Sequence, residues 1–121
     1  MDTEKTLERA VLVGLSADIY TEKEAVSESS MDELSELLKT AGGTEIGRVI
    51  QHRHAPEPKT LIGNGKANEI AEFIENNDIT LAVFDNELSP AQTKNLEDIL
   101  RVRVVDRSTL ILDIFASRAS G

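Results

Sequence analysis

The stretch "RAVLVGL", residues 9–15, contains a continuous apolar run of strand length and ends in Gly14 and Leu15. Strands with one solvated face alternate apolar and polar residues, whereas an unbroken apolar run is typical of a strand buried on both faces. Such strands occur in parallel sheets that are covered by helices on each side. The stretch therefore predicts a central parallel strand within an α/β fold.

Helix and strand patterns alternate along the rest of the chain. Residues 30–43 read as an amphipathic helix that opens with Ser30 and Glu33 in a capping-box relation and stops at two glycines. Further strands are expected at 44–53, 79–85 and 102–106, and further helices at 66–77, 89–100 and 108–121, with Ser89 and Ser108 as helix caps and a bulge near Gly47. This order predicts a mostly parallel sheet of about four strands, joined by right-handed crossovers, with helices packed on it.

The composition fits one cytoplasmic domain. The 121 residues suffice for a single layered core, and residues 16–29, which lack a sustained period, are expected to form a mobile connection. The chain has no cysteine, which excludes disulfides and thiolate metal sites and fits a reducing compartment. No apolar run approaches the roughly 20 residues of a membrane span, and the acidic first ten residues do not resemble a signal peptide.

The net charge of -9 opposes nonspecific binding to polyanions, yet one region is basic. Residues 46–66 carry a balance of +3, from four basic residues and Glu57, so the rest of the chain sums to -12. The four basic residues are Arg48, Arg53, Lys59 and Lys66. They suit an anionic partner, or they are ordinary surface residues. His52 and His54 lie in the same region but lack a companion ligand set, so no metal site is predicted.

The turn "TLIGNGKANEI", residues 60–70, places Gly63, Gly65 and Lys66 at the start of a predicted helix. It is not a Walker loop, because Thr60 and Ala67 stand where that motif needs a glycine and a hydroxyl. It also lacks the third glycine of the dinucleotide fingerprint. The two glycines either let the backbone approach a phosphate, with Lys66 adding charge, or only turn the chain.

Two carboxylates follow predicted strands and would lie where α/β sheets bind ligands. Asp85 and Asp106, together with Lys66, are candidates for a nucleotide crevice. The favoured role of both carboxylates is structural, with Asp85 starting a loop and Asp106 capping the final helix while pairing with Arg107 or another base. No serine has the G-x-S-x-G context of a hydrolase, and no catalytic residue is predicted.

Three phrases taken together resemble the N-terminal domain of HflX-type GTPases. They are "TLIGNGKANEI" (60–70), "DNELSPAQTKNLED" (85–98) and "VVDRSTLILDIFASRA" (104–119). The similarity extends over nearly the whole chain and is strongest from Thr60 to Ala119. In the family this domain is followed by a helical hairpin and a G domain, whose Walker, DxxG and NKxD motifs are missing from this sequence.

The resemblance implies a cytoplasmic, ribosome-associated protein that acts in ribosome splitting or rescue, notably under stress. It implies GTP and magnesium as cofactors of the parent protein, with none in this fragment. The implied partners are the large ribosomal subunit with its RNA and the protein's own G domain. The phosphate or RNA contacts would come from Arg48, Arg53, Lys59, Gly63, Gly65 and Lys66.

Three functional hypotheses follow from these readings. The first is a noncatalytic domain that binds the ribosome and couples that contact to the G domain through the final helix. The second is an ATP-binding domain with weak hydrolysis, using the crevice near Asp85, Asp106 and Lys66. The third is a scaffold that restrains the GTPase rate of its own G domain.

Overall fold

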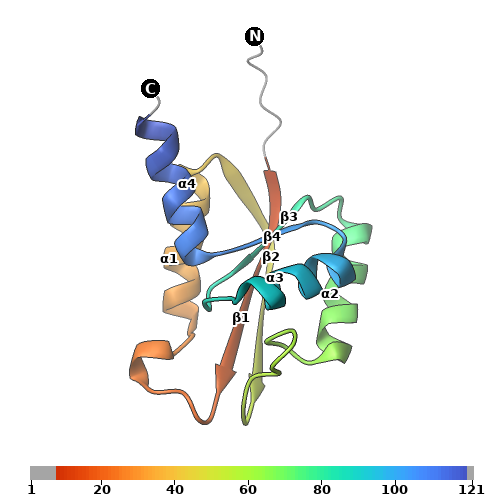
Figure 1. Ribbon diagram of the computed structural model, residues 1–121. Coiled ribbons are helices and arrows are strands. Elements are labelled where there is room, and N and C mark those ends of the chain that lie inside the picture. Colours follow the sequence, from red (N-terminus) through yellow and green to blue (C-terminus); the bar gives the residue numbers. More distant parts are fainter. Residues whose placement is uncertain (1–7, 120–121) are drawn as a thin grey trace.

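Four parallel strands form one sheet in the computed structural model, which describes residues 8–119 (Figure 1). The strands are β1 (Glu8–Ala17), β2 (Gly43–Arg53), β3 (Leu81–Phe84) and β4 (Arg103–Asp106), in the spatial order β2-β1-β3-β4. The helices are α1 (Glu28–Thr40), α2 (Asn64–Asn76), α3 (Pro90–Leu100) and α4 (Arg107–Ala119), with a short 3-10 helix η1 (Glu22–Glu24). The predicted parallel α/β architecture is confirmed.

Helices cover both faces of the sheet and create two apolar cores. Helices α1 and α4 lie on one face and α2 and α3 on the other, as Figure 1 shows. Strand β1 contributes side chains to both cores. Leu12 points toward α1 and α4, while Val11 and Val13 point toward α2 and α3, and all three are fully buried. This alternation is the reason for the unbroken apolar run at residues 9–15, since each side chain finds an apolar partner layer.

The predicted irregularity near Gly47 is a bulge in β2. The pairing shifts between Ala10 with Glu45 and Val11 with Gly47, which leaves Ile46 as the extra residue. A Cβ on Gly47 would lie 2.8 Å from the ring of Phe73 on α2, so glycine lets that ring approach the strand. The bulge therefore sets which residues of β2 face which helix layer.

Helix α1 begins earlier than the capping pattern predicted. Ser27, not Ser30, is the N-cap: the Ser27 hydroxyl accepts from the Ser30 amide at 3.1 Å, and the Ser30 hydroxyl accepts from the Ser27 amide at 2.9 Å. Ser30 takes the place of the usual Glu or Gln in the box, so the pattern of a serine followed by Glu or Gln three residues later does not mark this cap. The expected connection at 16–29 is also shorter, because β1 continues to Ala17 and η1 interrupts the remainder.

The other helix starts agree better with the sequence patterns. Ser89 caps α3 with Pro90 as its first residue, as predicted. Helix α4 is capped by Asp106 and not by Ser108, because the Thr109 amide donates to the Asp106 carboxylate at 2.9 Å. The last two residues of the helix expected at 108–121 lie outside the described residues.

The chain reverses its direction of winding at β1. From β1 it crosses through α1 to β2 at one edge, then returns through α2 to β3 on the other side of β1. In parallel sheets such a reversal opens a crevice beyond the carboxyl ends of the two strands involved, here β1 and β3. Within residues 8–119, no helix has the length and apolar character needed to cross a membrane.

Candidate functional site

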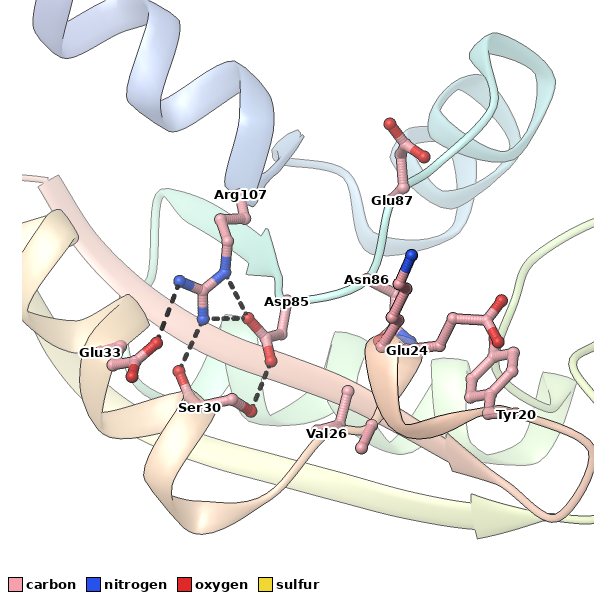
Figure 2. A pocket seen from close by; sticks show the side chains of 11 residues that line it. Tyr20, Glu24, Val26, Ser30, Glu33, Asp85, Asn86, Glu87 and Arg107 are labelled. Carbon is pink, nitrogen blue, oxygen red and sulfur yellow. Dashed lines mark hydrogen bonds and ion pairs between the residues drawn. The ribbon is translucent and has the colours of Figure 1, made fainter.

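A pocket of about 520 Å³ lies at this crevice, between the loops that follow β1 and β3 (Figure 2). Its lining includes Tyr20, Glu24 and Val26 from the first loop and Asp85 to Glu87 from the second. The starts of α1 and α4 close one side with Ser30 and Arg107. The pocket therefore joins four elements at the position where this topology binds ligands.

Asn86 extends the contact between β1 and β3 beyond the last paired residues. Its side-chain oxygen accepts from the Leu15 amide at 2.7 Å, and its nitrogen donates to the Leu15 carbonyl at 3.0 Å. The carboxamide thus satisfies the two backbone groups that another strand residue would have paired. This double contact holds the loop after β3 against β1 and shapes the wall of the pocket.

Asp85 is the centre of a partly buried ionic network (Figure 2). Its side chain is only 4% exposed and accepts from Arg107 Nε at 2.8 Å, from Arg107 Nη2 and from the Ser30 hydroxyl at 2.7 Å. Arg107 Nη2 also donates to the Ser30 carbonyl at 2.7 Å. These contacts tie together β3, α1 and α4, so Asp85 has a structural role at the edge of the pocket.

Asp106 acts as the predicted cap but does not pair with Arg107. One oxygen accepts from the Thr109 amide, and the other accepts from the Leu88 amide at 3.0 Å, which anchors the loop before α3. Neither Asp106 nor Lys66 lines the pocket, and Lys66 pairs with Glu69 on α2 at 3.0 Å. The structure therefore does not bring the predicted crevice residues Asp85, Asp106 and Lys66 into one site.

The electrostatics of the pocket do not favour a polyanion. Among its lining residues, Glu24, Glu33, Asp85 and Glu87 oppose two cations, Lys23 and Arg107, and Arg107 is already paired with Asp85. Burial raises the pKa of the Tyr20 hydroxyl, and the nearby Glu24 carboxylate raises it further. The pocket can hold a polar ligand, but a chain of phosphates would meet uncompensated carboxylates.

The two histidines, His52 and His54, both contact the carboxylate of Asp18 at the carboxyl edge of the sheet. His52 Nε2 lies 2.8 Å and His54 Nδ1 lies 3.4 Å from the oxygens of Asp18. The hydrogen bond with His52, followed by that with His54, lowers the pKa of the Asp18 carboxyl. No group of three His, Cys, Asp or Glu side chains suited to a metal ion occurs within residues 8–119.

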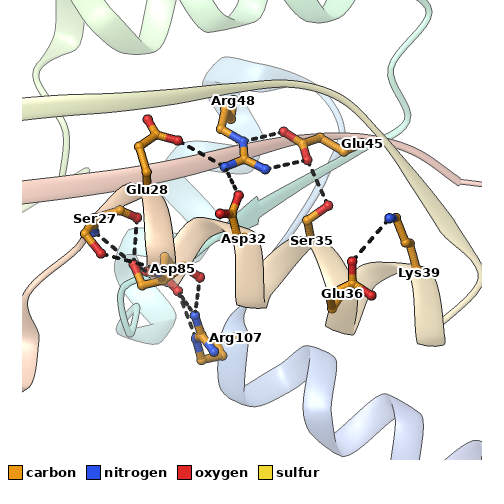
Figure 3. Close-up of polar contacts among 11 residues, drawn as sticks. Ser27, Glu28, Asp32, Ser35, Glu36, Lys39, Glu45, Arg48, Asp85 and Arg107 are labelled. Atoms are coloured by element: carbon orange, nitrogen blue, oxygen red, sulfur yellow. Dashed lines mark hydrogen bonds and ion pairs between the residues drawn. The ribbon is translucent and has the colours of Figure 1, made fainter.

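Arg48, one of the predicted basic residues, is surrounded by carboxylates (Figure 3). It is on the α1 face of β2, where its guanidinium contacts Glu45 at 2.6 Å, Asp32 at 2.8 Å and Glu28 at 3.1 Å. Arg53 is on the opposite face, beside Gly63. The +3 balance of residues 46–66 is therefore not the charge of one surface, because three carboxylates surround Arg48.

The glycine turn is a rigid, partly basic surface. Gly63 caps α2, and its amide donates to the Gln51 side chain at 2.9 Å. A Cβ on Gly63 would lie 2.6 Å from Arg53 Nη1, whereas one on Gly65 would meet nothing within 4 Å. The carbonyl of Lys59 accepts from Asn95 of α3 at 3.0 Å, which fixes the turn against the body of the domain.

Replacing Glu45 by Gln is expected to reduce stability by about 1 kcal/mol at pH 7, since the charged hydrogen bonds to Arg48 become neutral. The hydrogen bond from Arg48 lowers the pKa of Glu45 below its usual 4.5. The stabilisation is thus present above pH 4.5 and is lost as the pH falls through the lowered pKa. Urea unfolding of both proteins across this range measures the difference. Glu36→Gln, at an exposed pair with Lys39, is the control and should show little change at any pH.

Comparison with known proteins identifies the family of this domain. Residues 28–116 match the model of the GTP-binding GTPase N-terminal family. The chain belongs to this family. More specifically, it is an HflX-type N-terminal domain, because HflX GTPases align with 93% of its length at 43–49% sequence identity.

Two relatives of the HflX-type domain illustrate this match. GTPase HflX of Lacrimispora saccharolytica is 49% identical over 112 residues, which cover 93% of this chain and 26% of that protein. GTPase HflX of Escherichia coli is 43% identical over 112 residues, covering 93% of this chain and 25% of that protein. The chain thus spans about a quarter of the length of these curated relatives.

Solved structures support the fold of the HflX-type domain. A GTP-binding protein from Sulfolobus solfataricus in complex with GDP superposes with a TM-score of 0.66 at 22% identity, over 91% of this chain and 30% of that one. At this identity the likeness concerns the fold alone.

The three phrases that carry the HflX resemblance interlock in space. The second phrase is tied to the residue just before the first phrase, where Asn95 donates to the carbonyl of Lys59. The second and third meet where Arg107 contacts Asp85 and where Asp106 accepts from Leu88. Most of this network could not be found from the sequence, because its partners are 18 or more residues apart.

Proposed function

We propose that this domain is a noncatalytic part of a ribosome-associated GTPase. It binds the large ribosomal subunit, regulates the G domain, or does both, in ribosome splitting or rescue under stress in the cytoplasm. GTP and magnesium are then used by the G domain of the parent protein and not by this fragment. The family membership supports the link to a GTPase, and the geometry of the glycine turn supports the contact with RNA.

The observation that carries the RNA contact is the rigid turn at the start of α2. Arg53, Lys59 and Lys66 belong to this turn or border it. Its backbone is held by a hydrogen bond from the Gly63 amide to Gln51 and by one from Asn95 to the Lys59 carbonyl. A Cβ on Gly65 would meet nothing within 4 Å, so the space beside the first turn of α2 is open there, and helix starts favour phosphate. Glu57 and Glu69 pair with Arg53 and Lys66, so the contact is modest and local.

The observation that supports regulation is the outer face of α4. Leu112 and Phe115 are 67% and 65% exposed and lie one turn apart on the helix. The first turn of α4 is fixed to the body through Arg107. A partner that displaces α4 by contacting its outer face would therefore also move the loops at the carboxyl edge of the sheet. Such a displacement would couple this domain to its G domain.

The double variant Lys59→Glu/Lys66→Glu is expected to weaken binding to purified large ribosomal subunits by at least about tenfold, because it reverses two charges on the proposed RNA surface. Co-sedimentation across a salt series measures the effect, and binding of the original protein should itself decrease with salt. Arg48→Gln is a control at a basic residue outside the proposed surface, since its guanidinium is occupied by three carboxylates on the other face of β2.

Equal binding by the double variant and the original protein would contradict the role of the glycine turn. Absence of pelleting at low salt would contradict an independent ribosome contact. In that case the regulatory role would stand alone, and removal of the domain should change GTP turnover of the parent protein without ribosomes.

A nucleotide-binding role is the second candidate, since the pocket between the loops after β1 and β3 lies where such sheets hold nucleotides. Its excess of carboxylates makes ATP a poor fit. Saturable protection of the isolated domain against heat by ATP would favour this candidate over the first.

A further inference from the structure

A second groove lies at the opposite edge of the sheet, between the carboxyl ends of α2 and α3. Its volume is about 680 Å³, and it includes Ile79 and Val102, which precede β3 and β4. Because these strands are parallel, the groove lies at their amino ends, away from the glycine turn and the candidate pocket. It is therefore separate from the site described above.

The floor and walls of this groove are apolar. Ile74, Ile79 and Leu100 form a floor that is nearly fully buried and belongs to the core between the sheet and helices α2 and α3. Ala71, Ile99 and Val102 form the walls and are only partly buried while packing on the same core. An apolar side chain placed here would extend the core instead of covering a polar surface.

The rim of the groove is acidic. Glu72 and Glu75 on α2 and Asp78 beyond it face one cation in the lining, Arg101. The carboxyl ends of both helices add negative potential, and neither helix has a basic residue in its last turn. Arg9 of β1 offsets part of this at α2, where it donates to the carbonyls of Asn77 and Asp78 at 2.9 and 3.1 Å.

We propose that this groove docks a segment of a partner protein in which apolar residues are flanked by lysine or arginine. The apolar side chain would occupy the floor, and the basic residues would face Glu72, Glu75 and Asp78. Charge complementarity selects this occupant, because a nucleic acid would meet three carboxylates and an uncharged peptide would leave them without partners. The proposal is independent of the ribosome contact, which uses the other edge of the sheet.

The test is a titration of the 121-residue protein with a synthetic basic peptide at physiological salt. Binding is monitored by the NMR chemical shifts of the backbone amides. The probe has about twelve residues, with leucine at helical spacing and lysine elsewhere. We expect saturable shifts confined to residues 71–79 and 99–102. A second peptide with serine in place of leucine should bind much more weakly, since it cannot fill the floor.

Two variants with equal net charge separate docking from general attraction to an acidic protein. Glu72→Gln/Glu75→Gln should weaken binding by about fivefold, whereas Glu22→Gln/Glu36→Gln, which removes the same charge elsewhere, should change it by less than about twofold. Equal losses in both variants, shifts spread over the whole acidic surface, or equal binding of the serine peptide would overturn the proposal. So would the absence of saturable shifts.

Discussion

Replacing Arg107 by Ala is expected to lower the free energy of unfolding by about 2–3 kcal/mol, as measured by urea unfolding at pH 7. The substitution leaves Asp85, whose side chain is 4% exposed, without its charged partner. It also removes the donor to the Ser30 carbonyl. The expected cost is smaller than the roughly 3–5 kcal/mol for a fully buried pair because the Arg107 side chain is itself 27% exposed.

Two further variants make this expectation specific. Arg103→Ala removes an exposed pair with Asp113 and should cost less than about 0.5 kcal/mol. The double variant Asp85→Asn/Arg107→Ala should lose clearly less unfolding free energy than the two single variants lose together, because it no longer contains an uncompensated charge. An Arg107→Ala protein as stable as Arg103→Ala would show that the network does not hold α4 to the sheet.

Phe84→Ala is expected to be the most damaging single substitution, with a loss of about 3–5 kcal/mol. Phe84 is fully buried in β3 and packs in the core between the sheet and helices α2 and α3. Removing its ring deletes apolar contacts and leaves a cavity that the surrounding strands cannot close, because they are held in register on both sides.

Phe115→Ala is the matched control for this substitution, since it removes the same atoms from a side chain that is 65% exposed. It should change stability by less than about 0.5 kcal/mol in urea unfolding. Phe84→Leu, which keeps most of the volume, should cost roughly 1–1.5 kcal/mol. Similar losses for Phe84→Ala and Phe115→Ala would contradict the described burial of β3.

Local sequence was sufficient for the order of the four strands and four α-helices and for one irregularity, but not for η1 or the start of α1. The run at residues 9–15 identified a doubly buried strand, and Ser89 with Pro90 marked the start of α3. Gly47 signalled the bulge because Val49 was out of step with the alternation before it. These features depend on residues within a few positions of one another, so their pattern is visible in the chain.

The candidate site was only partly predictable. Asp85 was expected at the end of a strand, which is where it lies, but its partner was not foreseen. Phe84 pairs with Asp106 in the sheet, so the residues that follow, Asp85 and Arg107, come side by side. That adjacency requires β3 and β4 to be neighbours, and a distance of 22 residues along the chain does not reveal it.

Grouping by sequence was misleading for Arg48. Proximity along residues 46–66 suggested one basic surface, but alternation along β2 places Arg48 and Arg53 on opposite faces of the sheet. Carboxylates from α1 then surround Arg48. The sum of charges over a segment is thus a poor guide to a surface when a strand runs through that segment.

The amino-acid sequence by itself determined the strands, the helices and the parallel arrangement. An unbroken apolar run and a helix cap are patterns of neighbouring residues, so each is visible within its own element. Only the tertiary structure decided which charges meet, where the two pockets form and which basic residues share a surface. The reason is geometric: these features depend on the order of strands in the sheet and on the side of each strand that a residue faces. Both are set by contacts between segments that are distant in the chain.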